Sequence, residues 1–334
     1  MKSGRSKLDK WDDLRMQVFN NPTPNEIKMA TKALKDGNLV AFPTETVYGL
    51  GADATNEKAV GRIYSSKGRP LDHPLIVHIS SIDLMNEWAI DIPAYATKLA
   101  EEFWPGPITL ILKRSDLAKD FITGSQDTVG LRVPAHSVAK ELLASFEKLG
   151  GFGIAAPSAN RFGAVSATSS DAVAEEMGNF LTTNDVIING GSSRIGIEST
   201  IIDCTKYSPC ILRPGAITRE MVEKTLNMRL YSIIEGTKVK YSGSFKSHYS
   251  PKARVKLTGP AQPGDGFIAL SKIATPRGAI RLASPEDLNQ YAEQFYSALR
   301  LGDTQGIKTI VIIPPDGDGL SEAIADRIDK AAYR

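Results

Sequence analysis

The feature that most constrains the fold is an alternation of short apolar runs with segments whose apolar residues recur at helical spacing. The apolar runs predict strands at 39–42, 75–79, 108–112, 128–133, 153–156, 186–189, 200–203 and 211–213. The helical spacing predicts helices at 25–35, 56–63, 94–103, 138–149 and 172–177. Helices between strands indicate an α/β fold. Because the alternation is less regular than in a doubly wound sheet, we expect some antiparallel pairing.

A second, smaller α/β pattern follows a polar stretch at 236–251 that has the character of a linker. Strands are predicted at 266–270, 279–283 and 309–313, and helices at 284–301 and 320–332. Ser284 is the predicted N-cap of the first of these helices, with Pro285 in its first turn. This pattern is typical of a small Rossmann-like domain. We therefore predict a polar N-terminal extension at 1–24, a first domain at 25–232, a linker at 233–252 and a second domain at 253–334.

Composition excludes several classes of protein. A chain of 334 residues with 42% hydrophobic and 23% charged residues has enough apolar material for roughly two packed domains. No apolar run approaches the length of about 18 residues that spans a bilayer, and residues 1–21 do not have the pattern of a secretory signal. Cys204 and Cys210 cannot form a disulfide framework or a zinc site, which favours reduced thiols and a cytoplasmic location.

The segment 42–51, FPTETVYGLG, is the first candidate for a binding site. A strand ends at a proline, hydroxyl and carboxylate side chains crowd the following turn, and Gly49 and Gly51 leave backbone amides open to an anion. The alternative is a turn rich in threonine for its own hydrogen bonds.

The basic segment 62–78 is a candidate phosphate clamp. Lys67 and Arg69 flank a glycine at a predicted helix end, in a loop that Pro70 and Pro74 stiffen. His73 and His78 lie beside them. The alternative is a pair of cations favoured only by the negative end of the helix dipole.

Further cations and small polar residues follow strand ends. Arg132 alternates with apolar neighbours in TVGLRVP, so it either lies on an exposed strand face or binds a ligand carboxylate through two hydrogen bonds. The segments APSAN, GGSSRIGIEST and LRPG supply small residues, hydroxyls and Arg213. Neither a P-loop, a dinucleotide-binding fingerprint nor a nucleophile elbow is present in the sequence. Cations, hydroxyls and glycines suit the positioning of a nucleotide and the stabilisation of charge at phosphorus.

Taken in order, FPTETVYGLG, SKGRPLDHPLIVHI, WPGPITLIL, VGLRVPAH, APSAN, GIESTIID and LRPG closely resemble the threonylcarbamoyl-AMP synthase family. The segment SHYSP resembles the linker of its two-domain form, and GDGLSEAIADRIDKAA resembles the end of the second domain. The resemblance implies a twisted, mixed, open sheet of the YrdC-like type, joined by a linker to a small Rossmann-like domain. It spans residues 25–334.

The resemblance also implies a reaction. L-threonine, bicarbonate or carbon dioxide, and ATP would give threonylcarbamoyl-AMP and pyrophosphate, for modification of tRNA beside the anticodon. Threonine would first form a carbamate, whose oxygen attacks the α-phosphorus of ATP. Magnesium is expected to accompany ATP, although no protein ligand for it can be named. A downstream tRNA threonylcarbamoyl transferase and a weak contact with tRNA are the expected macromolecular partners, and no membrane is expected.

Site residues follow by matching positions within the motifs. The resemblance implies that Lys67 and Arg69 are catalytic, because they would neutralise the triphosphate and the developing charge. The implied L-threonine contacts are Thr46, His78, Arg132, Ala156 and Ser199, with Arg132 binding the carboxylate. The implied ATP contacts are Arg69, His73, Thr128, Ser158, Ser166, Arg213, His248 and Tyr249. His248 and Tyr249 would close over the site as a lid. His73 stands where the family usually has asparagine.

Two other functions share this fold. The first is a non-catalytic RNA-binding module, disfavoured by a net charge of only +2 and by the lack of a basic strand interleaved with aromatic residues. The second is the carbamoyl-transfer domain of a maturation enzyme, disfavoured because acylphosphatase-like and zinc-binding segments are missing from the sequence.

Overall fold

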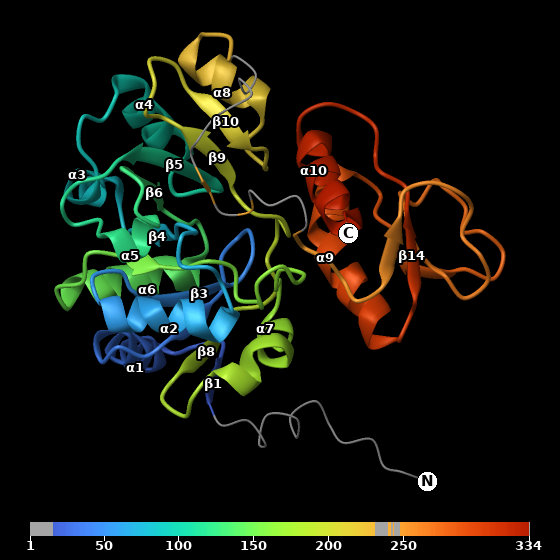
Figure 1. Ribbon diagram of the computed structural model, residues 1–334, viewed down its shortest axis with the longest axis horizontal. Helices are drawn as coiled ribbons and strands as arrows, with labels where there is room; N and C mark the ends of the chain where they lie inside the picture. Colours follow the sequence, from blue (N-terminus) through green and yellow to red (C-terminus); the bar gives the residue numbers. More distant parts are fainter. Residues whose placement is uncertain (1–15, 231–239, 242, 244–247, 334) are drawn as a thin grey trace.

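The computed structural model describes residues 16–230, 240–241, 243 and 248–333. Two sheets organise these residues. The larger sheet lies in the part coloured blue to yellow in Figure 1, and the smaller one in the orange and red part beside it. The rest of the predicted extension and linker, at 1–15, 231–239, 242 and 244–247, lies outside the described residues.

The larger sheet is open and mixed, as predicted. Its spatial order is β1-β8-β2-β3-β7-β4-β6-β5-β9-β10. The strands are β1 (Gln17–Asn20), β2 (Val40–Phe42), β3 (Gly49–Asp53), β4 (Ile76–His78), β5 (Ile108–Lys113), β6 (Thr128–Arg132), β7 (Ile154–Ala155), β8 (Val186–Asn189), β9 (Thr200–Asp203) and β10 (Cys210–Arg213). The strand β4 pairs in parallel with β6 and antiparallel with β7, so the ends of β4 and β6 meet at one edge of the sheet.

Helices cover both faces of this sheet. They are α1 (Pro24–Lys35), α2 (Glu57–Lys67), α3 (Met85–Trp88), α4 (Ala94–Phe103), α5 (Asp120–Thr123), α6 (Ser137–Lys148), α7 (Ser170–Met177) and α8 (Arg219–Leu226). Alternate residues of β2 and the position before it enter different cores: Leu39 and Ala41 pack with α2 and α4, whereas Val40 and Phe42 pack with α1 and α6. Both faces of the sheet are therefore buried, which fixes the register of its strands.

The smaller sheet is parallel and carries two helices, as expected for a Rossmann-like domain. Its order is β11-β14-β12-β13. The elements are β11 (Arg254–Lys256), β12 (Gly266–Ile268), β13 (Ile280–Ala283), α9 (Leu288–Thr304), β14 (Thr309–Ile312) and α10 (Leu320–Ala332).

The predicted start of α9 is wrong. The N-cap is Asp287, whose carboxylate accepts the backbone N–H of Gln290, and the helix begins at Leu288 rather than at Ser284. Ser284 and Asp287 are both favourable N-cap residues. The carbonyl of Pro285 accepts the N–H of Ser271, however, which holds residues 284–286 in an extended connection before the helix.

The predicted N-terminal extension is wrong for its last residues. Gln17–Asn20 form an edge strand parallel to β8, and Phe19 packs into the core that α1 and α6 cover. The strands β3 and β11 and the helices α3, α5 and α8 were not predicted either. Both cysteines are free, but only Cys204 is buried, since Cys210 is partly exposed. Of the described helices, none has the length and apolar character needed to cross a membrane.

Candidate active site

A small polar cavity lies where strands β4, β6 and β10 end. Its volume is about 40 Å³, room for a few water molecules. It is lined by Thr44, Thr46, Val47, Tyr48, Gly49, Ile76, His78, Arg132, Ala156, Pro157, Ser158, Glu198, Ser199, Arg213, His248 and Tyr249. Two arginines and two histidines, all buried, thus face this cavity.

Arg132 is the last residue of β6 and is buried, so the exposed-face alternative is excluded. Its guanidinium donates from Nε to the carbonyl of Gly106 (3.2 Å), from Nη1 to Oγ1 of Thr46 (2.9 Å) and from Nη2 to Oε1 of Glu45 (2.6 Å). Glu45 also accepts the N–H of Ala135 through Oε2. Since a guanidinium has five N–H groups, the three bonds fix its orientation and leave two N–H groups for a ligand.

His78 ends β4 directly opposite Arg132 in the parallel register. Its ring packs edge-on against Phe42 at 6.0 Å between centroids. Burial, and then the charge of Arg132, lower the pKa of His78 to about 3. Its buried Nδ1 has no hydrogen-bond partner among the described residues. His78 is therefore a neutral imidazole at physiological pH, whose unprotonated nitrogen can accept a hydrogen bond from a ligand.

The threonines of the turn after β2 serve both the hydrogen bonds of the turn itself and the candidate binding site. Thr44 Oγ1 accepts the N–H groups of Thr46 and Val47 and donates to the carbonyl of Val47, which is the local turn. Thr46, in contrast, also accepts from Arg132 and lines the cavity. The threonines therefore build a tight turn that presents one hydroxyl to the site.

The two glycines after this turn allow close packing of strands, and Gly49 also lines the cavity. A β-carbon on Gly51 would lie 2.7 Å from Cγ2 of Ile154 and 2.9 Å from Cε1 of Phe42. A β-carbon on Gly49 would lie 3.2 Å from that of Ala156. Both glycines belong to β3, which the sequence pattern did not reveal.

Lys67 and Arg69 are buried rather than exposed at a helix end. Helix α2 ends at Gly68 in the left-handed conformation, with Lys67 in its last turn. Lys67 Nζ donates to the carbonyls of Ser158 (2.6 Å) and Asn160. Burial, and then the charge of Arg69, hold the pKa of Lys67 well below its usual value. Buried cations with a perturbed pKa cluster at functional sites, which favours the clamp over a pair placed only by the helix dipole.

Arg69 and Arg213 extend this positive region toward the cavity. Arg69 donates from Nη2 to the carbonyl of Pro74 (2.9 Å), and burial lowers its pKa to about 10. Arg213, at the end of β10, donates from Nε to the carbonyl of Ser199 (3.0 Å) and from Nη2 to its hydroxyl (3.2 Å). The charge of Arg213 also lowers the pKa of Arg69, so the two guanidinium groups lie close enough to repel.

His248 and Tyr249 cover the cavity from the linker side. The two rings are 4.1 Å apart, and the His248 ring meets Phe162 edge-on at 6.0 Å. Phe162 in turn contacts the His73 ring at 5.7 Å. Burial lowers the pKa of the His248 ring to about 3. The backbone N–H of His248 donates to the carbonyl of Lys330 (3.4 Å). The linker therefore bridges the aromatic wall of the site and helix α10.

The structure gathers nine of the predicted site residues around the cavity. They are Thr46, His78, Arg132, Ala156, Ser158, Ser199, Arg213, His248 and Tyr249. Lys67 reaches this wall through Ser158, and Arg69 interacts with Lys67 and Arg213.

The remaining predicted contacts lie outside the cavity lining. His73 is buried beside Arg69, and Thr128 begins β6, on the same face as Arg132 four residues later. Ser166 donates its hydroxyl to Glu198 (2.6 Å). Glu198 lines the cavity but was not singled out, because a lone acid in GIEST gives no sequence signal of its own.

Known proteins resemble this chain in both sequence and structure. A family model described as telomere recombination matches residues 32–215, and one described as threonylcarbamoyl-AMP synthase, C-terminal domain, matches 217–333. The threonylcarbamoyl-AMP synthase of Pyrococcus abyssi is 40% identical over 329 residues, covering 92% of this chain and 95% of its own. The threonylcarbamoyl-AMP synthase of Schizosaccharomyces pombe is 28% identical, and the match covers 96% of this chain and 92% of the relative. The crystal structure of P. abyssi Sua5 complexed with L-threonine matches with a TM-score of 0.84 at 35% identity, covering 94% of this chain and 97% of that one.

Proposed function

The chain belongs to the threonylcarbamoyl-AMP synthase family, and we propose that its cavity forms threonylcarbamoyl-AMP from L-threonine, bicarbonate or carbon dioxide, and ATP. The observation that carries this conclusion is one cavity that Arg132 and Arg213 line together, with Lys67 and Arg69 behind its wall, all four cations being buried. Joining a carbamate to a nucleotide brings two anions into contact. Buried, fixed cations stabilise that encounter far more than exposed ones.

The end of the cavity at β4 and β6 suits threonine. Its carboxylate would take the two N–H groups of Arg132 that remain after the bonds to Gly106, Thr46 and Glu45. The neutral ring of His78 beside it would accept from the amine, which must be uncharged to react with carbon dioxide. The backbone at Ala156 and the hydroxyl of Ser199 close this end.

The nucleotide would lie toward Lys67, Arg69 and Arg213. A carbamate oxygen attacks the α-phosphorus, the bond from that phosphorus to the bridging oxygen breaks, and pyrophosphate leaves. Negative charge therefore builds on oxygens that face the three cations. The cations are already fixed by carbonyl groups, so little reorganisation is needed when the charge develops. His73, Thr128, Ser158 and Ser166 remain proposed ATP contacts.

We propose that magnesium enters with ATP rather than on a protein site. Among residues 16–230, 240–241, 243 and 248–333, no group of three or more His, Cys, Asp or Glu side chains could hold a metal ion. Glu198 is the one carboxylate among the residues lining the cavity, and Ser166, Tyr296 and Arg327 already bind it. Magnesium would neutralise the triphosphate, and the chain's own contribution is its lysine and arginines.

The linker must move for substrates to enter. A volume of about 40 Å³ holds a few waters but not a nucleotide, and His248 and Tyr249 form one side of it. The linker is also tied down at its exposed end, where Lys240 Nζ lies 2.6 Å from Oδ2 of Asp72. An exposed pair of this kind is weak, so it opens at little cost. We propose that His248 and Tyr249 act as a lid.

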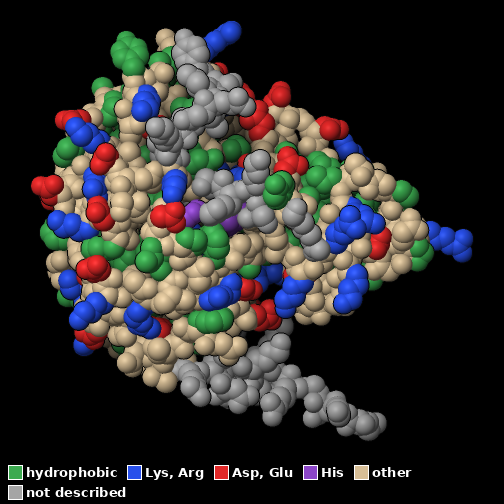
Figure 2. Space-filling model, viewed as in Figure 1, with side chains coloured by type: hydrophobic (Ala, Val, Ile, Leu, Met, Phe, Trp, Pro, Cys, Tyr) green, Lys and Arg blue, Asp and Glu red, His purple; other side chains and the backbone are tan. Residues whose placement is uncertain are grey.

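The product is proposed to pass to a tRNA threonylcarbamoyl transferase, with a weak tRNA contact on this chain. The RNA-binding alternative without catalysis is not favoured, because basic and acidic side chains are interspersed on the face shown in Figure 2. Two free cysteines accord with a proposed cytoplasmic location, where thiols stay reduced.

The decisive experiment measures pyrophosphate release by the full chain with ATP, magnesium and bicarbonate, with and without L-threonine. Release that requires both threonine and bicarbonate is expected. Release that is indifferent to threonine, or salt-dependent tRNA binding with no turnover, would contradict the proposed function.

A further inference from the structure

Glu198 is a buried carboxylate in a cavity proposed to receive two anionic substrates. It precedes Ser199 and β9, and it lines the cavity together with Arg213. A carboxylate in this position has two unfavourable consequences: it repels phosphate, and it attracts the arginine that phosphate needs. Some other group must therefore neutralise Glu198.

The neutralising groups come from the second sheet's helices. Arg327 of α10 donates from Nε to Oε2 of Glu198 (3.1 Å) and from Nη2 to its backbone carbonyl (3.2 Å). Tyr296 of α9 donates its hydroxyl to Oε2 (2.9 Å). Arg327 is completely buried and also donates from Nη1 to the carbonyl of Pro214 (2.7 Å). Arg327 also pairs with Asp326 of its own helix, Nη1 lying 2.8 Å from Oδ2, so its geometry is fixed from both sides of the contact between the two units.

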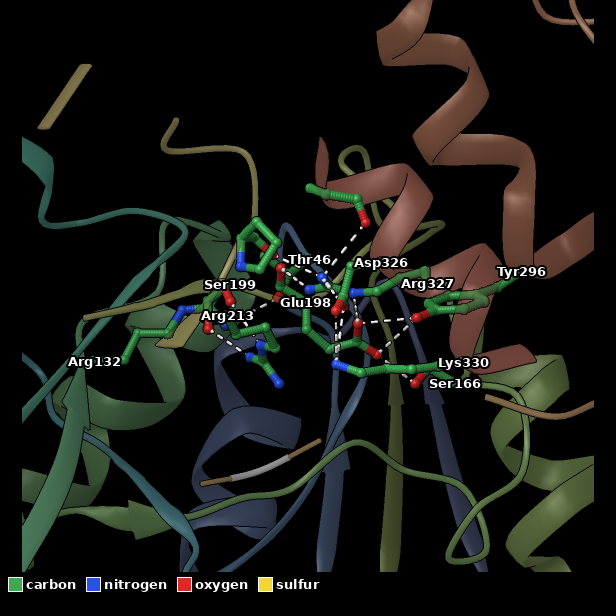
Figure 3. A network of polar contacts seen from close by, with 12 residues as sticks. Thr46, Arg132, Ser166, Glu198, Ser199, Arg213, Tyr296, Asp326, Arg327 and Lys330 are labelled. Carbon is green, nitrogen blue, oxygen red and sulfur yellow. Dashed lines mark hydrogen bonds and ion pairs between the residues drawn. The ribbon is translucent and has the colours of Figure 1, made fainter. Parts of the chain in front are cut away.

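Figure 3 shows Glu198 between two arginines. Arg327 lies on the side of α10, and Arg213 lies on the opposite side, with its guanidinium bonded to Ser199. Burial alone would raise the pKa of Glu198, but Arg327 first and Arg213 second lower it to about 2. The carboxylate is therefore charged, and both arginines are within electrostatic reach of it.

We propose that Arg327 is a positioning residue of the second domain, which binds and neutralises Glu198 and thereby prevents this carboxylate from repelling the nucleotide's phosphates. This inference rests on the proposed function, because it places those phosphates in the cavity. The second domain then has a defined task in turnover, because it controls the charge of the cavity. Arg327 does so through Glu198, since Arg327 is not itself among the residues that line the cavity.

The test is a charge-rescue experiment on the full chain. Binding of a non-hydrolysable ATP analogue with magnesium, and separately of L-threonine, is measured by calorimetry for Arg327→Gln, Glu198→Gln and the double variant. Arg327→Gln is expected to weaken analogue binding at least tenfold and threonine binding less than threefold. In the double variant, analogue binding is expected to return to within threefold of wild type, because the uncompensated charge is gone.

Arg300→Gln is the matched control. Arg300 also joins the two units, through Glu176 at 3.3 Å and the carbonyls of Val165 and Ser166, but it does not line the cavity. Its analogue affinity is expected to stay within twofold of wild type. An equal loss in Arg300→Gln would mean that domain docking in general, rather than the charge of Glu198, sets ATP affinity, and would overturn the proposal.

Two further outcomes decide the matter. Analogue binding that stays weak in a folded double variant would assign Arg327 a merely structural role and overturn the proposal. If Arg327→Gln does not fold, the double variant alone is decisive: near-normal analogue binding supports the proposal, and a tenfold loss refutes it. Wild-type pyrophosphate release is measured in parallel, so that failure of the proposed function is seen separately.

Discussion

Nη2 of Arg132 lies 2.6 Å from Oε1 of Glu45, and their side chains are only 5% and 11% exposed. Glu45 is itself held by the N–H of Ala135. The pair therefore fixes a guanidinium at a strand end, and two of its N–H groups have no hydrogen bond to the part of the chain that the structure describes. This arrangement favours recognition of a planar carboxylate, because a fork whose orientation is already set loses little entropy on binding.

Replacing Arg132 with alanine is expected to weaken L-threonine binding by a factor of ten or more. The loss corresponds to a charge-assisted pair of about 2 kcal/mol. Calorimetric titration of threonine would measure it. Arg114→Ala is the control, since Arg114 pairs with Asp120 away from the cavity. Unchanged threonine affinity in a folded Arg132→Ala protein would show that the carboxylate binds elsewhere.

Stability is expected to fall as the pH drops from 7 to 5. The pKa values of His78 and His248 are lowered to about 3, against 6.5 in the unfolded chain. Between pH 7 and pH 5 the unfolded state therefore binds protons that the folded state does not bind. Each histidine lowers the free energy of unfolding by about 2 kcal/mol over this range. Urea unfolding at both pH values measures the sum. His248→Gln should reduce the slope, and stability unaffected by pH over this range would contradict the buried, neutral state of both rings.

Gly51→Ala is expected to destabilise the protein by about 1–3 kcal/mol, because its β-carbon would overlap Ile154 and Phe42. Gly61→Ala is the matched control. Gly61 lies inside α2 with open space around its β-carbon position, so alanine there should gain up to about 1 kcal/mol from helix propensity. Thermal unfolding of both variants gives the comparison. Equal effects would show that β3 tolerates a wider spacing from its neighbours than the structure has.

Gly243→Ala is expected to disturb the lid. Its β-carbon would lie 2.7 Å from the hydroxyl of Tyr249 and 3.4 Å from Nη1 of Arg213, at a φ of +84° that alanine rarely adopts. Displacing the Tyr249 ring should raise the KM for ATP more than that for threonine, by severalfold. Steady-state pyrophosphate release under variation of each substrate tests this. Gly259→Ala, also at positive φ but with open space around it, is the control for backbone strain alone.

Strand periodicity and motif order predicted the mixed sheet and the residues that gather at the cavity. His78 and Arg132 stand at strand ends, where apolar alternation gives way to a polar residue, so the pattern marks both. Their direct pairing depends on β4 lying next to β6, which no local pattern encodes. The strand β1 was missed because four residues with one buried side chain give too short an alternation.

Glu198 and Arg327 illustrate what local sequence cannot supply. They are 129 positions apart, and Arg327 occurs in a helix segment, ADRIDK, whose charges are typical of a solvated face. Only the packing of α10 against the first unit turns this arginine inward. The glycines of FPTETVYGLG illustrate the same limit. A glycine needed for close strand packing, such as Gly51, looks the same in sequence as one that exposes an amide to a ligand.

The ion pair between Glu198 and Arg327 sets a condition for chimaeras of the two units. A chain that joins residues 16–230 to a foreign second unit without a cation at this position keeps Ser166 and Arg213 near Glu198 but loses the buried counterion that α10 supplies. Such a chimaera is expected to keep its activity only when the acid and its counterion are transferred together.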